Sequence, residues 1–306
     1  MDLKKKLYLI IDAGGTYFKS ALLNAHGEIK EGSVFKIRSW SEGPAEQIIN
    51  AYRETVSHGL EYIKERSADL GGIGIATPGP FDYEKGIPLM RHKFAFIYGL
   101  NLSDLIHNMP GVQPDIPICF MHDANATLAG ELWKGNAQGY NNVALVTLGT
   151  GLGFAFSQNG KIQYNSQGGP AISIYKLPYK NGILEDYISK RGILKIYGDL
   201  SNKKFIKVIE VSDIGKWANE GDKACLDTFK EAGKILSEAL YSILYEWQIQ
   251  CFLFGGQISR SYHLMERSFK SGLQGISSLK KISVVNNFNN SAFWGVLWDL
   301  IYKIKD

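Results

Sequence analysis

Cysteine is scarce in this sequence: only Cys119, Cys225 and Cys251 occur in 306 residues, and no two of them form a CxxC pair. Neither a disulfide framework nor a cysteine-rich zinc site is therefore expected, and free cysteines are typical of a reducing cytosol. Long apolar runs are lacking too. No stretch approaches the roughly 20 residues that cross a bilayer, and the run 7–11 is too short for a signal peptide. We therefore expect a cytoplasmic protein with no membrane partner.

An excess of charge of one sign is also missing. The net charge is +4, and the only dense basic run is 4–6. A charge so small and dispersed does not indicate a nucleic-acid partner. Hydrophobic residues make up 45% and charged residues 21% of the chain, which excludes wholesale disorder. The length suits two domains of about 150 residues each.

Predicted strands alternate with predicted helices, which places the chain in the α/β class. Short apolar runs rich in β-formers indicate strands, and apolar residues at helical spacing indicate helices. The expected strands cover 7–11, 17–23, 28–37, 72–76, 116–121, 143–147, 152–157, 161–164 and 250–254, and the expected helices cover 44–66, 102–108, 124–133, 221–247 and 291–304.

The second half of the chain repeats the opening. A strand, a glycine-rich turn, a strand, a second turn and a third strand begin at residue 7 and again at residue 143. Two such units in one chain predict a structural duplication. The proline-rich stretch 110–117 predicts the boundary, which gives an N-terminal domain over 1–117 and a C-terminal domain over 118–306. The C-terminal helix 291–304 can pack back on the first domain.

Three glycine-containing turns each follow an apolar strand: Gly14-Gly15, Gly149-Thr150-Gly151 and Gly255-Gly256. Glycine lets a backbone approach a ligand and point successive N–H groups at it, although any one such turn is also simply a tight turn. Together the three turns could line one cleft between two half-molecules. A nucleotide is the natural ligand, with its phosphates on the first two turns and its base or ribose on the third. Thr16 and Thr150 would add hydroxyl donors.

Two acidic residues lie at the ends of predicted strands. Asp12 follows the first strand, where it could hold a hydrated Mg2+ on the phosphates or form an Asx turn. Asp123 begins the predicted helix 124–133, where capping the helix is its simple structural role. A carboxylate at that place can also accept a proton from a substrate hydroxyl beside the phosphates. The three glycine turns favour the catalytic interpretation of Asp123.

These motifs resemble those of the ROK family of sugar kinases, within the actin-like ATPase superfamily. Residues 12–16 (DAGGT) resemble the family's first phosphate motif, and 74–80 (GIATPGP) are similar to its G-x-x-x-P-G-P segment. Residues 123–131 (DANATLAGE) resemble its catalytic D-A-N-A…G-E run. Residues 149–153 (GTGLG) resemble its second phosphate motif, and 254–259 (FGGQIS) its adenosine motif. The matches keep the family's order over nearly the whole chain.

The resemblance implies two actin-like (ribonuclease H-like) α/β domains with a cleft between them. It implies ATP-dependent phosphorylation of a sugar hydroxyl, on a hexose or an N-acetylated amino sugar, with Asp123 as general base and Mg-ATP held by the glycine turns. Gly79, His122, Asp123 and Glu185 would contact the sugar. Domain closure would exclude water, which otherwise competes as the phosphoryl acceptor. The resemblance also favours a homodimer.

Several segments depart from the family pattern. Members usually carry G-E-x-G-H and then a zinc-binding run of one histidine and three cysteines. Residues 166–172 instead read SQGGPAI, so a structural zinc ion is not expected. His122 stands where the family commonly has a sugar-contacting asparagine, and it also fits a histidine buried in the core. Glu185 stands where the family's glutamate binds a sugar hydroxyl, and it also fits an acid at a helix N-terminus. Residues 91–96, at the family's sugar-contacting loop, give no clear match.

Two other functions fit the same residues. One is a non-catalytic sugar or nucleotide sensor. Some ROK relatives are repressors with an N-terminal helix-turn-helix, which we do not expect here because the first predicted strand begins at residue 7, so a sensor would need a separate partner. The other is a different small-molecule kinase of the superfamily, such as one that phosphorylates a carboxylate. The presence of Asp123 and of all three glycine turns favours the sugar kinase.

Overall fold

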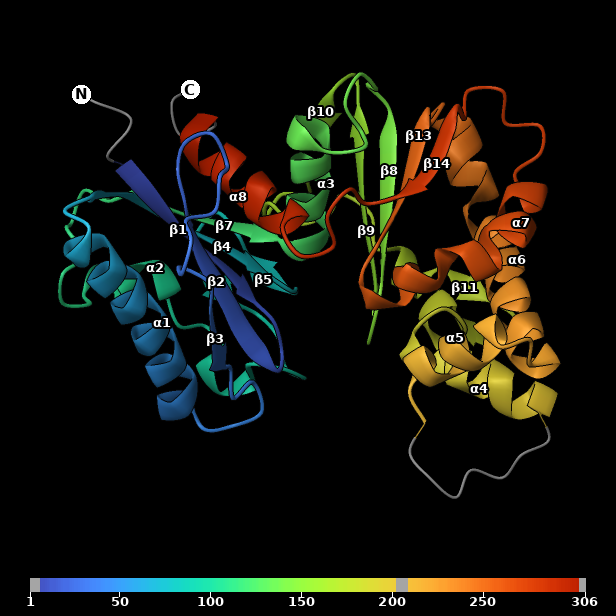
Figure 1. Cartoon of the computed structure of the whole chain (residues 1–306), viewed down its shortest axis with the longest axis horizontal. Helices are drawn as coiled ribbons and strands as arrows, with labels where there is room; N and C mark the ends of the chain where they lie inside the picture. Colours follow the sequence, from blue (N-terminus) through green and yellow to red (C-terminus); the bar gives the residue numbers. More distant parts are fainter. Residues whose placement is uncertain (1–5, 202–208, 303–306) are drawn as a thin grey trace. The chain divides into compact units, whose positions relative to one another are not determined.

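The computed structural model describes residues 6–201 and 209–302. Lys4 and Lys5 of the basic run, and residues 303–304 of the predicted C-terminal helix, lie outside the described residues. The chain forms two compact units, each built on a five-stranded mixed sheet with helices packed against it (Figure 1). The α/β class expected from the sequence is thus confirmed. The first unit comprises Met1–Lys134, Tyr164–Pro170 and Asn289–Asp306, and the second comprises Gly135–Gln163 and Ala171–Phe288.

The sheet of the first unit has the strand order β3-β2-β1-β4-β7. The first three strands form an antiparallel meander, whereas β4 and β7 continue the sheet parallel to β1. Parallel strands place their carboxyl ends at the same edge, and this edge carries the residues of interest. The strands are β1 (Lys6–Ala13), β2 (Tyr17–Leu23), β3 (Phe35–Arg38), β4 (Asp69–Thr77) and β7 (Ile118–His122), with a separate hairpin of β5 (Phe81–Asp82) and β6 (Ile87–Pro88).

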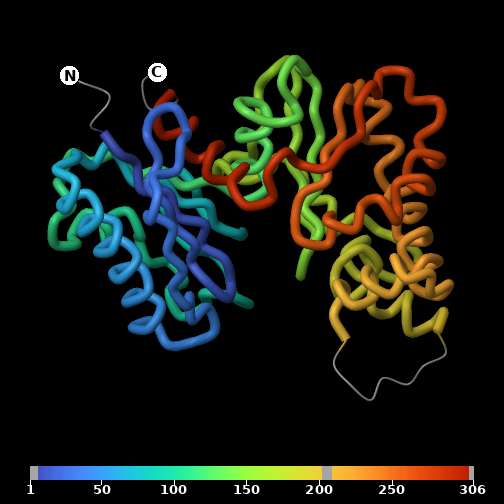
Figure 2. The backbone as a smooth tube through the Cα atoms, in the orientation of Figure 1, coloured from blue at the N-terminus to red at the C-terminus, as the bar shows by residue number. Residues whose placement is uncertain are grey.

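Helices cover both faces of this sheet. Leu9 lies against Gly59 of α1, whereas its neighbour Ile10 meets Val296 of α8 beside Gly74. Successive strand residues point to opposite faces, so α1 and α8 lie on opposite sides. Figure 2 shows the C-terminal segment, in red, returning to the blue N-terminal strands. The helices are α1 (Ala45–Glu65), α2 (Leu102–His107), α3 (Asp123–Lys134) and α8 (Ser291–Tyr302), with a 3-10 turn η2 (Ala95–Ile97).

Helices α3 and α8 cross with their backbones in contact. A Cβ atom at Gly130 would lie 1.9 Å from the carbonyl oxygen of Ser291, and one at Gly295 would lie 1.8 Å from that of Ala126. Beside this crossing the fully buried Glu131 accepts a hydrogen bond of 2.6 Å from the Ser291 hydroxyl. Because a Cβ atom has no room at either crossing position, glycine is required at both residue 130 and residue 295. This crossing holds the helix that begins at Asp123 in place.

The second unit repeats the first. Its sheet has the order β10-β9-β8-β13-β14, with β8, β9 and β10 antiparallel and β13 and β14 parallel to β8. The positions and senses match those of the first sheet strand for strand, so the predicted duplication is confirmed. The strands are β8 (Val143–Leu148), β9 (Leu152–Gln158), β10 (Lys161–Ile162), β13 (Cys251–Gly255) and β14 (Lys281–Val284), with a hairpin of β11 (Pro178–Tyr179) and β12 (Gly182–Ile183).

Helices α6 and α7 cover one face of the second sheet (Figure 1). Phe252 and Phe254 of β13 pack on Phe269 of α7 with ring centroids 5.1 and 4.9 Å apart. The sequence pattern predicted α6 but missed α4, α5, α7 and β14; β14 is a short edge strand with every residue only half buried. The helices are α4 (Lys190–Ser201), α5 (Val211–Asn219), α6 (Lys223–Glu246) and α7 (Tyr262–Gly272), with 3-10 turns η3 (Ile174–Lys176), η4 (Leu184–Asp186) and η5 (Gln257–Ser261).

The division into units differs from the one predicted between residues 117 and 118. Strand β7 pairs with β4 and so completes the first sheet, and α3 follows it, which extends the first unit to Lys134. Proline content marked the loop before β7 rather than the end of the unit. Helix α8 packs on β1, β4 and β7 of the first unit.

The helix crossing yields a stability test. In Gly295→Ala the added methyl group cannot fit against the carbonyl of Ala126, so α8 must move away from α3. We expect the free energy of unfolding to fall by about 1–3 kcal/mol, measured by chemical denaturation. Ser57→Ala, on the exposed face of α1, is the matched control and should stay within about 0.5 kcal/mol of the parent. Equal midpoints for both variants would contradict the close crossing.

Candidate active-site residues in the two units

The carboxyl edge of the first sheet gathers the predicted residues of that unit. In the strand register Asp12 pairs with Ala76, and Thr77 pairs with His122. Asp123 follows directly as the first residue of α3. The first glycine turn, the segment after Thr77 and the start of α3 therefore meet at one edge. Ligands of α/β proteins commonly bind at such an edge.

The first glycine turn is tightly held. The N–H of Gly14 donates to the carbonyl of Asp12 over 3.0 Å, and the hydroxyl of Ser41 donates to the carbonyl of Gly15 over 2.5 Å. A Cβ at Gly14 would lie 3.0 Å from the carbonyl oxygen of Tyr17. The side chain of Thr16, next in the turn, is exposed. The turn is thus a fixed, compact backbone with one exposed hydroxyl.

The carboxylate of Asp123 is open to solvent, with its side chain 46% exposed. Its Oδ1 lies 3.0 Å from Nδ1 of His122, whose side chain is 15% exposed, and accepts the N–H of Ala124 over 2.7 Å. Desolvation raises the pKa of Asp123, but the charge and hydrogen bond of His122, the Ala124 N–H and the charge of Lys93 together outweigh it and hold the pKa below its usual value. The group is therefore an ionised, accessible proton acceptor.

Asp12, in contrast to Asp123, has a raised pKa. Burial raises its pKa, the carboxylate of Asp123 raises it further, and Lys19 on the neighbouring strand opposes both, with the result that the pKa of Asp12 is about 6. Two carboxylates thus repel each other at this edge. A cation bound beside Asp12 would reduce that repulsion.

Three residues near this edge were not among the predicted site residues: Tyr83, Lys19 and Lys93, of which only Lys93 lies in a segment, 91–96, that the family comparison of the sequence had marked. The hydroxyl of Tyr83 donates to the carbonyl of Thr77 over 3.2 Å, and a Cβ at Gly79 would lie 3.1 Å from that hydroxyl. Gly79 therefore has a packing role against Tyr83 in addition to its predicted contact with sugar. Tyr83 and Lys93 come from segments distant in the sequence from both carboxylates, whereas Lys19 lies seven residues after Asp12 and meets it through the pairing of β1 with β2.

The second glycine turn is supported by Glu185. Its Oε2 accepts the N–H of Leu152 over 2.9 Å, and a Cβ at Gly151 would lie 2.9 Å from the same oxygen. The N–H of Lys190 donates to the carbonyl of Gly149 over 2.8 Å. The side chain of Thr150 is exposed. Glu185, within the 3-10 turn η4, thus orders the backbone of the turn that the sequence predicted to bind phosphate.

The third glycine turn lies directly against the second. Parallel pairing of β13 with β8 sets Gly255 opposite Thr147. Gly256 has a positive φ of 80°, and a Cβ there would lie 2.3 Å from the carbonyl oxygen of Leu148. The hydroxyl of Ser259 closes the turn by donating to the carbonyl of Gly255 over 2.6 Å. Two glycine turns that are about a hundred residues apart in sequence are therefore neighbours, as one nucleotide site requires.

Each unit thus carries its own set of predicted residues. Within each set the members meet at the carboxyl edge of that unit's sheet. The first unit holds Asp12, Gly14, Gly15, Thr16, Gly79, His122 and Asp123, and the second holds Gly149, Thr150, Gly151, Glu185, Gly255 and Gly256.

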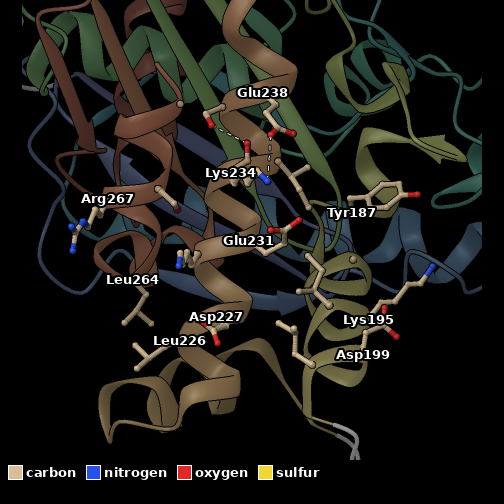
Figure 3. Close-up of a pocket in the computed structure, with 18 of the residues that line it drawn as sticks. Tyr187, Lys195, Asp199, Leu226, Asp227, Glu231, Lys234, Glu238, Leu264 and Arg267 are labelled. Atoms are coloured by element: carbon tan, nitrogen blue, oxygen red, sulfur yellow. Dashed lines mark hydrogen bonds and ion pairs between the residues drawn. The ribbon is translucent and has the colours of Figure 1, made fainter. Parts of the chain in front are cut away.

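A cavity of about 1170 Å³ in the second unit lies along α4, α6 and α7 (Figure 3). Its lining has equal numbers of basic and acidic side chains, such as Lys234 and Glu238, which form an ion pair of 3.9 Å. None of the predicted site residues lines it. Opposite charges offset each other along its walls, so it offers no concentrated field for a phosphate or a cation.

Within residues 6–201 and 209–302, no three or more histidine, cysteine, aspartate or glutamate side chains group so that they could hold a metal ion. Within the same residues no helix combines the length and apolar character needed to cross a bilayer.

The two duplicated α/β units define a two-domain actin-like fold. A ROK family glucokinase from Streptomyces griseus, solved with glucose and AMPPNP, matches with a TM-score of 0.78 and 22% identity over 95% of this chain and 98% of that chain. A ROK family transcriptional regulator, a homologue of the E. coli MLC protein, matches with a TM-score of 0.83 and 18% identity over 98% of this chain and 81% of that chain.

The sequence itself gives the family. Residues 8–173 and 177–297 match the ROK family, so this chain belongs to it. The glucokinase of Halalkalibacterium halodurans is 26% identical over 282 residues, which cover 83% of this chain and 81% of that protein. The resemblance identified from the motifs is confirmed at the level of family and fold.

The carboxylate pair yields a pH test. The carboxyl group of Asp12 should titrate at about pH 6, and Asp123→Asn should lower that pKa because it removes the neighbouring negative charge. Lys19→Met should raise it. Side-chain carbon-13 NMR measures both changes. An Asp12 pKa that is the same in all three proteins would show that these charges do not interact.

The same shift sets a pH dependence of stability. The folded state raises the pKa of Asp12 from 3.8 to about 6, so it binds this proton more tightly than the unfolded chain does. The stabilising contribution is fully present below about pH 3.8 and is lost as the pH rises through about 6. Asp12→Asn should therefore raise the free energy of unfolding at pH 7, by about 3 kcal/mol for a shift of about two pKa units, with little gain near pH 4. Denaturation at the two pH values measures it, and an equal gain at both would contradict this origin.

Proposed function

We propose that this chain catalyses ATP-dependent phosphorylation of a sugar hydroxyl, on a hexose or an N-acetylated amino sugar. The observation that carries the proposal is the ionised, half-exposed carboxylate of Asp123 at the carboxyl edge of the first sheet. In the same unit the first glycine turn lies at that edge. Membership of a family that includes sugar kinases supports the same reaction.

Asp123 acts as the general base. It accepts the proton of the sugar hydroxyl as the oxygen attacks the terminal phosphorus of ATP. His122, 3.0 Å from Oδ1 of Asp123, orients the carboxylate and offers a ring nitrogen to a neighbouring sugar hydroxyl. Phosphoryl transfer has a loose transition state, so positioning and charge neutralisation supply most of the rate enhancement.

The glycine turns and the two threonine hydroxyls hold the nucleotide. In the second unit, turns 149–151 and 255–256 are adjacent, which suits a phosphate chain on one and an adenosine on the other. In the first unit the turn 14–16 supplies the N–H groups of Gly15 and Thr16 and the Thr16 hydroxyl to the phosphate that is transferred, while the Gly14 N–H holds the turn closed. Mg2+ bound to ATP would neutralise phosphate charge, and Asp12 fits as its water-mediated ligand because Mg2+ in kinase sites needs only one or two carboxylates besides phosphate.

Gly79, His122 and Glu185 complete the proposed sugar contacts. Glu185 uses Oε2 to hold the Leu152 N–H, so its second oxygen is the one offered to a sugar hydroxyl. Gly79 offers its backbone beside Tyr83. The protein acts in the cytoplasm on a small-molecule sugar and ATP, needs no structural zinc, and forms a homodimer in this proposal.

Asp123→Asn tests the base. Without the carboxylate the hydroxyl proton has no acceptor, so kcat should fall by about 100-fold or more while sugar and nucleotide affinities stay near those of the parent. ADP release across a sugar panel with Mg-ATP measures the rate, and calorimetry measures binding. Asp104→Asn, exposed on α2, is the control and should keep full activity. Near-normal turnover in Asp123→Asn would remove Asp123 from the mechanism.

A second candidate is a non-catalytic sugar sensor. The structural match to a transcriptional regulator and the unmatched segment 91–96 favour it. Sugar binding by calorimetry without ADP release from any member of a broad panel would establish the sensor and exclude the kinase. A product that is labile to hydroxylamine would instead indicate an acyl phosphate, and hence a carboxylate kinase.

A further inference from the structure

Lys93 extends along the first glycine turn. Its Cδ, Cε and Nζ atoms lie 3.3 to 3.4 Å from the position that a Cβ at Gly15 would occupy. The side chain is only partly exposed, and within the described part of the chain its ammonium group has no hydrogen bond or ion pair. An unpaired cation is therefore held against the backbone proposed to receive the transferred phosphate.

The backbone fixes Lys93 to this turn. The next residue, Phe94, is buried, and its ring stacks on Phe18 with centroids 6.0 Å apart. The N–H of Phe94 donates to the carbonyl of Ser41 over 2.6 Å, and the hydroxyl of Ser41 donates to the carbonyl of Gly15 over 2.5 Å. Ser41 thus joins the lysine segment and the glycine turn, so their spacing does not depend on a flexible loop.

The charge of Lys93 also acts on the carboxylate of Asp123, whose pKa it helps to lower. Its ammonium group is therefore near both the phosphate turn and the proposed base. Lys19, a second lysine near this edge, already has interaction partners. Its Nζ donates to the carbonyl of Asn289 over 3.0 Å and lies 5.0 Å from the centroid of the Phe293 ring. Of these two lysines, Lys93 has the ammonium group that can turn to an incoming anion.

We propose that Lys93 is a further catalytic residue, whose ammonium group binds a non-bridging oxygen of the phosphoryl group during transfer. The proposal rests on the proposed function. The bond from the terminal phosphorus to the oxygen that leaves with ADP breaks, and a bond from that phosphorus to the sugar oxygen forms. The hydroxyl proton passes to Asp123, and Lys93 keeps all its protons. The lysine neutralises charge that is spread over the equatorial oxygens, as other kinases do with lysine, arginine or metal ions.

Lys93→Met tests this role because methionine keeps the aliphatic length and removes the charge. We expect kcat to fall by about 100-fold, with KM for the sugar within about threefold of the parent. Lys93→Arg should recover a large part of kcat. Lys85→Met is the matched control from the same unit, since its side chain is 73% exposed and pairs only loosely with Asp82 at 4.0 Å, and it should leave kcat unchanged.

Two further readouts separate catalysis from a structural role. Loss of the Lys93 charge raises the pKa of Asp123, so the acid limb of kcat/KM should move to higher pH in Lys93→Met and not in Lys85→Met. Calorimetry with AMPPNP should show weaker binding to Lys93→Met. Thermal midpoints equal to that of the parent exclude misfolding, and Lys93→Gln repeats the test if the methionine variant is unstable.

The outcomes are distinct. Unchanged kcat and AMPPNP affinity in Lys93→Met, or a raised KM for the sugar at unchanged kcat, would overturn the assignment while leaving the kinase intact. No ADP release from the parent with any sugar would refute the proposed function, and the AMPPNP measurement would still decide whether Lys93 contacts phosphate.

Discussion

Parallel pairing of β1 with β4, and of β4 with β7, is the constraint on which the first unit depends. It aligns the carboxyl ends of three strands and so sets Asp12 and Asp123 at one edge, although 111 positions separate them. No local contact could hold these two carboxylates together against their repulsion. Burial of the apolar faces of the strands offsets this repulsion. The central residues of β1 are fully buried between α1 and α8.

In the second unit parallel strand pairing has a different consequence. Parallel β8 and β13 bring two glycine turns into backbone contact, and Gly256 has no room for a side chain against Leu148. The carboxylate of Glu185, which lies outside the sheet, accepts the N–H of Leu152 and so fixes the second glycine turn. One duplicated topology thus presents acidic chemistry at the edge of one sheet and backbone N–H groups at the edge of the other.

Electrostatics at the first edge opposes stability, because two carboxylates interact there. Asp12 is held partly buried with a pKa of about 6, next to an ionised Asp123. Of the two nearby lysines, Lys19 is fixed to Asn289 and only Lys93 is uncommitted. Two interacting carboxylates beside a lysine that has no ion pair form a pattern that clusters at functional sites.

The sequence by itself determined the strands that precede the glycine turns, the duplication, the family and the position of Asp123, because these depend on local apolar runs and on motifs of a few neighbouring residues. Only the tertiary structure decided the extent of the first unit, the support of the second turn by Glu185, and the placement of Lys93 beside Gly15. Strand pairing and loop packing join segments that lie far apart in the chain, and no periodicity or short spacing records such contacts.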